Sequence, residues 1–176
     1  PGHMNKARNE IKEIMPQMDV VIEVIDARIP YSSENPMVAA LRGEKPVIKI
    51  LNKADLADPE LTKAWMEYLE QQDGVKAIAC DNNKADDVKR IIAICKSLVP
   101  NKVGTGRQIK AMIMGIPNVG KSTLINTLAG RAVARTGDEP AVTKSQQLIK
   151  LDDDIMLYDT PGMLWPKVEN ENSGYR

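Results

Sequence analysis

The sequence predicts an α/β fold: a doubly wound, mostly parallel sheet covered by helices on both faces, giving three layers. Two observations lead to this prediction. Runs rich in β-branched residues, such as Val20–Asp26, alternate with helical stretches such as Ala85–Leu98, and this alternation is typical of parallel sheets. Nearly continuous apolar runs also indicate strands buried on both faces. The length of 176 residues suffices for one domain with a substantial core.

Each expected element has a local cause. Pro16 should end the first helix, Pro36 suits a first helical turn, Asp58 is a helix cap, and Gly130 follows a helix. The expected helices are Asn5–Met15, Asn35–Leu41, Asp58–Gln72, Ala85–Leu98 and Ser122–Leu128. The expected strands are Val20–Asp26, Pro46–Leu51, Val75–Ala79, Ile109–Met114 and a hairpin of Gln147–Leu151 with Ile155–Tyr158. Residues 101–108 are expected to be a linker, 131–144 a mobile loop, and the chain from Met163 poorly ordered.

Composition excludes several classes of protein. Acidic and basic residues balance at 24 each, so net charge gives no argument for a nucleic-acid or membrane partner. No apolar run approaches the roughly 20 residues that a membrane helix needs. Cys80 and Cys95 form no C-x-x-C pair, and we expect reduced, half-buried thiols in a cytosol-like compartment.

A phosphate-binding loop is the most specific motif. Gly115–Ser122 reads G-x-x-x-x-G-K-S, and it lies between an expected strand and an expected helix. Backbone N–H groups there can surround phosphates at a helix N-terminus, Lys121 can reach β/γ oxygens, and Ser122 can ligate Mg²⁺. The expected phosphate contacts are Asn118, Val119, Gly120, Lys121, Ser122 and Thr123.

A second motif, Asn52-Lys53-Ala54-Asp55, follows the expected strand 46–51. By itself this tetrapeptide is equally well explained as a turn that caps the next helix. In a chain with a phosphate loop, Asp55 can accept two hydrogen bonds from guanine, which adenine cannot donate. A buried carboxylate left unpaired by the wrong base would reject it by about 10⁴-fold. The motif therefore predicts GTP over ATP, with Asn52, Lys53 and Asp55 as base contacts.

A third motif, Asp159-Thr160-Pro161-Gly162, follows the last expected strand. Asp159 can hold Mg²⁺ through water, and the Gly162 N–H can meet a γ-phosphate; an ordinary turn is the alternative. The base motif usually follows the phosphate loop, whereas here it precedes it. The motif order therefore predicts a circularly permuted P-loop NTPase fold.

The chain resembles the circularly permuted GTPases, and most closely their ribosome-assembly branch, the YlqF/RbgA family. Besides the three motifs, the resemblance rests on Pro1-Gly2-His3-Met4, Asp26-Ala27-Arg28-Ile29-Pro30, Thr136-Gly137-Asp138, Pro140, Thr143, Gln146-Gln147 and Leu164-Trp165-Pro166-Lys167. It implies a GTP-hydrolysing switch, with GTP/GDP and Mg²⁺ as cofactors, that acts on a large ribosomal subunit precursor. It also implies a cytoplasmic protein, and we expect a monomer without a membrane association.

The resemblance also assigns roles to single residues. Thr143 matches the switch threonine that closes on Mg²⁺ and the γ-phosphate, so the expected metal ligands are Ser122, Thr143 and Asp159. Ala79 and Cys80 lie where the family's second guanine-contacting loop begins, with any contact made by backbone. Asn118 matches a residue that helps to hold K⁺ in related GTPases; a simple spacer is the alternative.

The expected catalytic residues are His3, Lys121 and Thr143. Many GTPases orient the attacking water with a glutamine after the last motif glycine, but Met163 occupies that place, so we expect slow intrinsic hydrolysis. The resemblance points to His3 as the residue that positions water. The alternative interpretation is that Gly2-His3-Met4 is a remnant of cloning.

The resemblance defines a domain organisation and leaves alternatives open. Residues 1–176 are expected to form the GTPase domain, with 1–16 as an N-terminal helical arm and 163–176 as the start of a switch or linker. The family's C-terminal helical RNA-binding domain is absent, so we expect weak binding to ribosomal subunits. Basic residues near the phosphate loop are candidates for rRNA contacts, although solvated surface charge is the favoured explanation; they are Lys102, Arg107, Lys110, Arg131 and Arg135.

Two other functions are alternatives. A non-catalytic module that binds GTP without turnover is supported by Met163. Retention of Lys121, Ser122, Thr143 and Asp159 supports hydrolysis instead. ATP-driven transport or kinase activity is disfavoured because the base motif selects guanine.

Overall fold

The computed structural model describes residues 2–81, 84–131 and 146–160. One sheet of six strands runs through this part of the chain in the order β3-β2-β1-β4-β6-β5. The strands are β1 Val20–Asp26, β2 Val47–Asn52, β3 Val75–Cys80, β4 Ile109–Met114, β5 Gln147–Lys150 and β6 Ile155–Asp159. Neighbouring strands are parallel except β5 and β6, which form an antiparallel hairpin. The predicted mostly parallel sheet and its terminal hairpin are confirmed.

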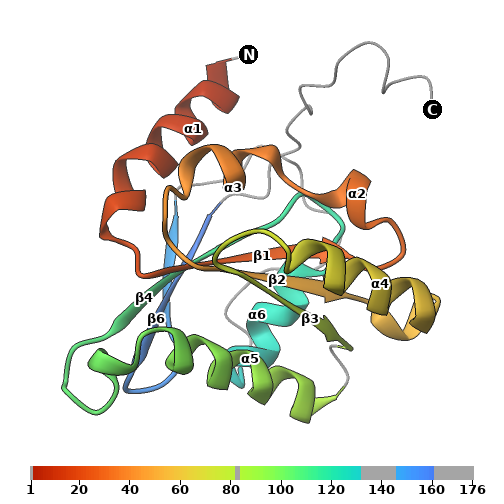
Figure 1. The fold of residues 1–176 in the computed structure, drawn as a ribbon. Coiled ribbons are helices and arrows are strands. Elements are labelled where there is room, and N and C mark those ends of the chain that lie inside the picture. Colours follow the sequence, from red (N-terminus) through yellow and green to blue (C-terminus); the bar gives the residue numbers. More distant parts are fainter. Residues whose placement is uncertain (1, 82–83, 132–145, 161–176) are drawn as a thin grey trace.

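Helices cover both faces of the sheet, as Figure 1 shows. The α-helices are α1 Gly2–Ile14, α2 Pro30–Ser33, α3 Pro36–Leu41, α4 Pro59–Leu69, α5 Ala85–Leu98 and α6 Lys121–Ala129. Short 3-10 turns are η1 Met15–Gln17, η2 Ala54–Leu56 and η3 Pro100–Lys102. Side chains of α1, α3 and α4 join the apolar cluster on one face, and those of α5 and α6 join the cluster on the other. The predicted three layers are therefore confirmed.

The central strand β1 explains why both faces are covered. All seven of its residues are buried, including the charged Glu23 and Asp26. Alternate residues point to opposite faces of a strand, so Ile22 belongs to one apolar cluster and Ile25 to the other. A strand buried on both faces needs this near-continuous apolar sequence.

Most helix boundaries follow the predicted signals. Asn35 caps α3 by accepting a hydrogen bond from the Met37 N–H, and Asp58 caps α4 in the same way through the Glu60 N–H. Pro16 lies inside η1 rather than ending the helical path abruptly. Helix α4 ends at Leu69, before the predicted end at Gln72, and the short α2 was not predicted.

The expectation for the two cysteines needs correction. Cys80 and Cys95 are fully buried, not half-buried, and burial raises the pKa of each thiol to about 12. Residues 101–108 connect α5 to β4 within the same domain, and Lys102 is tied to Asp19 by an ion pair of 2.8 Å. That segment therefore links α5 to β4, and the ammonium group of Lys102 already has an internal partner.

Other expectations lie outside the described residues, namely the loop over 132–144 and the chain from Met163. Within the described residues, no helix is both long and apolar enough to cross a bilayer.

The sheet order determines where a ligand can bind. From β1 the chain adds β2 and then β3 on one side, whereas β4 pairs with the other side of β1. Such a reversal opens a crevice at the carboxyl ends of the two central strands, where α/β proteins bind ligands. Asp26 is paired in register with Asn52, and Ile113 with Asp159, so the carboxyl ends of β1, β2, β4 and β6 lie on one edge.

Candidate functional site

The loop after β2 contacts the loop after β4 directly. Asn52 is fully buried, and its Nδ2 donates a hydrogen bond of 2.8 Å to the Val119 carbonyl oxygen. Lys53 Nζ donates a hydrogen bond of 2.8 Å to the Asn118 carbonyl oxygen. Two motifs separated by more than sixty residues in the chain are thus joined at one edge of the sheet.

The Gly115–Ser122 loop has the backbone of a phosphate cradle. Asn118 has a φ of 73°, and Gly120, which precedes α6, has a φ of 88°. This left-handed region costs most residues energy and favours Gly, with Asn among the more tolerant. A Cβ on Gly115 would lie 3.1 Å from Val119 Cγ2 and 3.2 Å from the Val24 carbonyl oxygen. Because Gly115 has no side chain, the loop can pack tightly against β1.

Lys121 begins α6, and its side chain is directed to the end of β6. Its Nζ forms an ion pair of 2.7 Å with Asp159 Oδ1 and also donates a hydrogen bond to the Thr160 carbonyl oxygen. Thr160 is held in turn, because its Oγ1 donates a hydrogen bond of 2.8 Å to the Ile113 carbonyl oxygen. The lysine and the aspartate that the sequence assigned to phosphate and metal thus contact each other here.

A third carboxylate, Asp26, lies at the end of β1. Its Oδ1 accepts hydrogen bonds from Arg28 N and Nε, at 2.9 and 3.0 Å, and its Oδ2 lies 2.7 Å from Arg28 Nη2. Lys53 Nζ is 3.7 Å from the same Oδ2. Burial opposes ionisation of Asp26, but the hydrogen bonds and charge of Arg28 outweigh it, so the pKa of this carboxyl lies below its ordinary value of 3.8.

The remaining predicted base contacts surround the same edge. Asp55 is exposed in η2, directly after Lys53, and Asn52 is paired in register with Cys80 of the next strand. Cys80 has no exposed surface and Ala79 is partly buried, so the thiol is not accessible to a ligand.

The remaining phosphate and catalytic assignments have mixed outcomes. Ser122 is partly exposed and Thr123 exposed on the first turn of α6. Thr143 and Gly162 lie outside the described residues, and so does Met163. The backbone of His3 belongs to the first turn of α1.

Sequence reasoning did not assign a role to Asp26, Arg28 or Thr160. Asp26 ends a β-branched run at the edge where the motifs meet, and this position was a usable signal. The contacts of Thr160 were not readable, because they depend on how far β6 extends beside β4.

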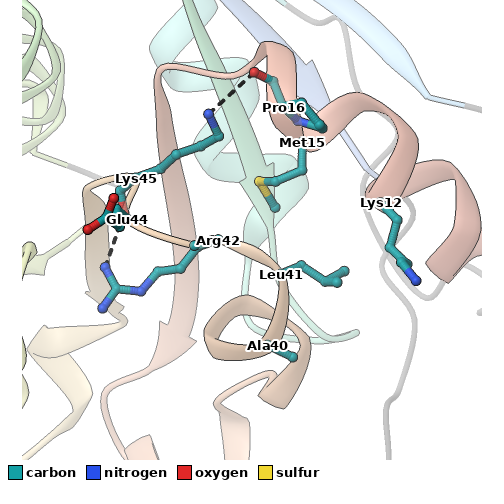
Figure 2. Close-up of a pocket in the computed structure, with 9 residues that line it drawn as sticks. Lys12, Met15, Pro16, Ala40, Leu41, Arg42, Glu44 and Lys45 are labelled. Atoms are coloured by element: carbon teal, nitrogen blue, oxygen red, sulfur yellow. Dashed lines mark hydrogen bonds between the residues drawn. The ribbon is translucent and has the colours of Figure 1, made fainter.

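The described residues also line an open hollow of about 650 Å³ elsewhere. It lies between the end of α1 and the loop that leads from α3 to β2, and its lining includes Met15, Leu41 and Arg42. Figure 2 shows Lys45 donating to the Pro16 carbonyl oxygen across it. These segments precede β1 and β2, so the hollow lies at the amino ends of the strands, opposite the motif edge. It is therefore separate from the candidate site.

Comparison with known proteins gives consistent matches. Residues 110–176 match the family model described as 50S ribosome-binding GTPase. Ribosome biogenesis GTPase A of Priestia megaterium is 48% identical over 184 residues, covering 100% of this chain and 64% of that protein. Mitochondrial ribosome-associated GTPase 1 of Xenopus tropicalis is 37% identical, covering 100% of this chain and 60% of that protein.

A solved structure shares the fold. The crystal structure of GNP-bound YlqF from T. maritima matches with a TM-score of 0.65 and 30% identity, over 95% of this chain and 62% of that one. The chain is similar along its whole length to the YlqF/RbgA family. The predicted likeness to this family and the P-loop fold are confirmed by these matches.

The YlqF/RbgA match has a defined extent. The chain spans about 64% of the length of the Priestia megaterium protein. What the whole relatives do is therefore carried to this chain only as a proposal.

Proposed function

We propose that this chain is the GTP-binding and GTP-hydrolysing domain of a switch protein that acts in assembly of the large ribosomal subunit. The observation that carries the proposal is the direct contact between the base loop and the phosphate loop, made by Asn52 and Lys53. This contact places the two loops next to each other, which supports binding of one guanine nucleotide by both. The names of the relatives support the ribosomal setting.

Guanine recognition is assigned to Asp55. Its exposed carboxylate can accept hydrogen bonds from the guanine N1–H and exocyclic amine. Lys53 would flank the base, and the backbone of Ala79 and Cys80 would meet its other edge. Binding of GTP and GDP with rejection of ATP, measured by competition against a fluorescent GDP analogue, tests this assignment. Equal binding of ATP would refute it.

The phosphates are assigned to the loop that precedes α6. The N–H groups of residues 118–123 would surround them at the helix N-terminus. Lys121 now neutralises Asp159 at 2.7 Å, and a triphosphate would offer its ammonium group a more highly charged partner. Release of Asp159 would then make its carboxylate available to Mg²⁺. This exchange of partners by Lys121 is the first step that we propose on nucleotide entry.

The donor set fits a magnesium ion. Hydroxyl and carboxylate oxygens are ligands that Mg²⁺ prefers, usually with several waters retained. Ser122 and Thr143 would ligate it directly and Asp159 through water, which suits the place of Asp159 at the end of β6. Held by these residues, Mg²⁺ would supply positive charge against the charge that develops on the phosphates. Asn118 is the residue assigned to a K⁺ ion, and the Gly162 N–H is assigned to the γ-phosphate.

Hydrolysis is assigned to Lys121 and Thr143 at the phosphates, with His3 orienting the water. Because Met163 cannot activate water, we expect slow turnover that ribosomal subunits accelerate. Replacing His3 by Ala should lower kcat and leave GDP affinity unchanged, with the exposed Asn5→Ala as a matched control in the same helix. Equal turnover in His3→Ala and the parent would refute the assignment.

A non-catalytic GTP-binding module is the second candidate, and Met163 favours it. Phosphate release at excess GTP, with and without 50S subunits, separates the two. More than one phosphate per chain, lost on Lys121→Ala, supports the enzyme. A single equivalent supports the module.

The wider setting is part of the same proposal. We infer a cytoplasmic monomer whose residues 1–176 form the GTPase domain, with 1–16 as its N-terminal arm and 163–176 leading toward an RNA-binding region. Sedimentation with purified 50S subunits in GTP and in GDP tests the partner. Tighter binding in GDP than in GTP would contradict a GTP-dependent switch.

A further inference from the structure

Asp26 is a buried carboxylate that none of the nucleotide motifs includes. Its side chain is only 4% exposed, yet it lies at the edge where the base and phosphate loops meet. Two basic side chains share it: Arg28 at 2.7 Å and Lys53 at 3.7 Å, both measured to Oδ2. Buried carboxylates are costly unless they are paired, so this position needs an explanation.

The fold holds Asp26 in place from several sides. Its N–H donates a hydrogen bond of 2.8 Å to Ser33 Oγ, and the Ala27 N–H donates one of 2.7 Å to the Asn52 carbonyl oxygen. Arg28 occupies Oδ1 twice, through its backbone and its Nε. The carboxylate is thus fixed relative to the start of the base loop and has little freedom to turn away.

Lys53 connects Asp26 to the phosphate loop. Its ammonium group lies between Asp26 Oδ2 and the Asn118 carbonyl oxygen, at 3.7 and 2.8 Å. Lys53 and Asn118 both have positive φ angles, 61° and 73°, a conformation that few side chains favour. Strained backbone of this kind persists only when neighbouring contacts hold it. The two residues hold each other, and Asp26 is the only acidic group in the described residues that pairs with Lys53.

We infer that Asp26 is a positioning residue for guanine nucleotide binding, which acts on the phosphate loop by fixing the ammonium group of Lys53 against the Asn118 carbonyl. This inference rests on the proposed function. Asp26 does not touch the nucleotide. Without its charge, Lys53 keeps one neutral partner and moves more freely, so both loops lose part of their preorganisation before the ligand arrives.

Arg28 has a separate part in this arrangement. Its guanidinium is 46% exposed, while the carboxylate that it holds is buried. Removing the guanidinium leaves Asp26 with the Arg28 backbone N–H and Lys53. We therefore expect Arg28→Ala to change nucleotide affinity less than Asp26→Asn does.

A double-mutant cycle on the 176-residue chain tests the inference. The dissociation constant of a fluorescent GDP analogue is measured for the parent, Asp26→Asn, Lys53→Ala and the double variant. Each single change should weaken binding by about tenfold, and the double variant should be no weaker than Lys53→Ala alone, because coupled residues are not additive. The control is Asp153→Asn, which removes a fully exposed carboxylate paired with a lysine on the β5–β6 turn.

The outcomes are distinct. Additive losses, or Asp26→Asn binding like the parent, overturn the inference while leaving the proposed function intact. A parent chain that binds no guanine nucleotide defeats the proposed function itself. Thermal unfolding without nucleotide shows whether each variant is folded. If Asp26→Asn is unfolded, Asp26→Ser, which retains an acceptor for the Arg28 N–H, takes its place in the cycle.

Discussion

Asn52 offers the sharpest test of the contact between the base and phosphate loops. Its side chain is fully buried, and Nδ2 donates the 2.8 Å bond to the Val119 carbonyl. Asn52→Ala leaves that carbonyl unpaired, which costs about 1–3 kcal/mol for a neutral group. The Asn52 Oδ1 has no hydrogen-bond partner among the described residues. Because the substitution also removes this unpaired acceptor, we expect a loss near the lower end, about 1 kcal/mol.

Asn52→Asp separates the hydrogen bond from side-chain volume. It keeps the shape but places a carboxylate oxygen where Nδ2 donates, 2.8 Å from a carbonyl oxygen. An uncompensated buried charge costs about 3–5 kcal/mol, so this variant should be less stable than Asn52→Ala. Urea unfolding without nucleotide measures both, with the exposed Asn101→Ala as control. If the two Asn52 variants match each other, or match the control, the bond to Val119 does not hold the loops together.

Three further outcomes are expected. Gly115→Ala should lower GDP affinity by about tenfold or more. The added Cβ would lie 3.1 Å from a Val119 methyl, and overpacking costs about 1–3 kcal/mol. Unchanged binding in the GDP competition assay would contradict this. Lys49→Met should reduce the free energy of urea unfolding by about 3–5 kcal/mol, because the fully buried Glu23 carboxylate would keep the Asn35 N–H but lose the ammonium group 2.8 Å away. A cost under about 1 kcal/mol would contradict a charged pair at this site. The lowered pKa of Asp26 means that its ionised form contributes stability above its ordinary value of 3.8, and that this contribution is lost as pH falls through the lower folded value. The parent should therefore lose more stability than Asp26→Asn in chemical unfolding below about pH 4, and parallel curves would contradict the shift.

The positions of the motifs were predictable because each motif directly follows the carboxyl end of a predicted strand. Val20–Asp26 and Ile109–Met114 have the same limits in the structure as in the prediction. In a parallel sheet the residues that follow such strands must meet at one edge, so the meeting of Asn52 with the phosphate loop follows from the element order alone.

The contacts within the site were not predictable in the same way. Nothing in the motif pattern shows that Lys53 adopts a positive φ, because that conformation depends on the Asn118 carbonyl that it reaches. The pairing of Lys121 with Asp159 depends on side-chain direction across two strands. The short α2 escaped prediction because four residues carry no helical periodicity, and the Ser33 hydroxyl that donates to the Ile29 carbonyl stabilises it.

The order of the strands gives the domain a seam. Every residue that we assign to the base precedes β4, and every residue that we assign to phosphate or metal follows it. The two halves join where β1 pairs with β4 over four residue pairs. A guanine nucleotide that contacts Asp55 with its base and Lys121 with its phosphates would connect the two halves of the domain. Binding of the nucleotide would then stabilise the β1–β4 junction between the halves, and its release would make that junction less rigid. A change of ligand would thus change the rigidity of the whole sheet.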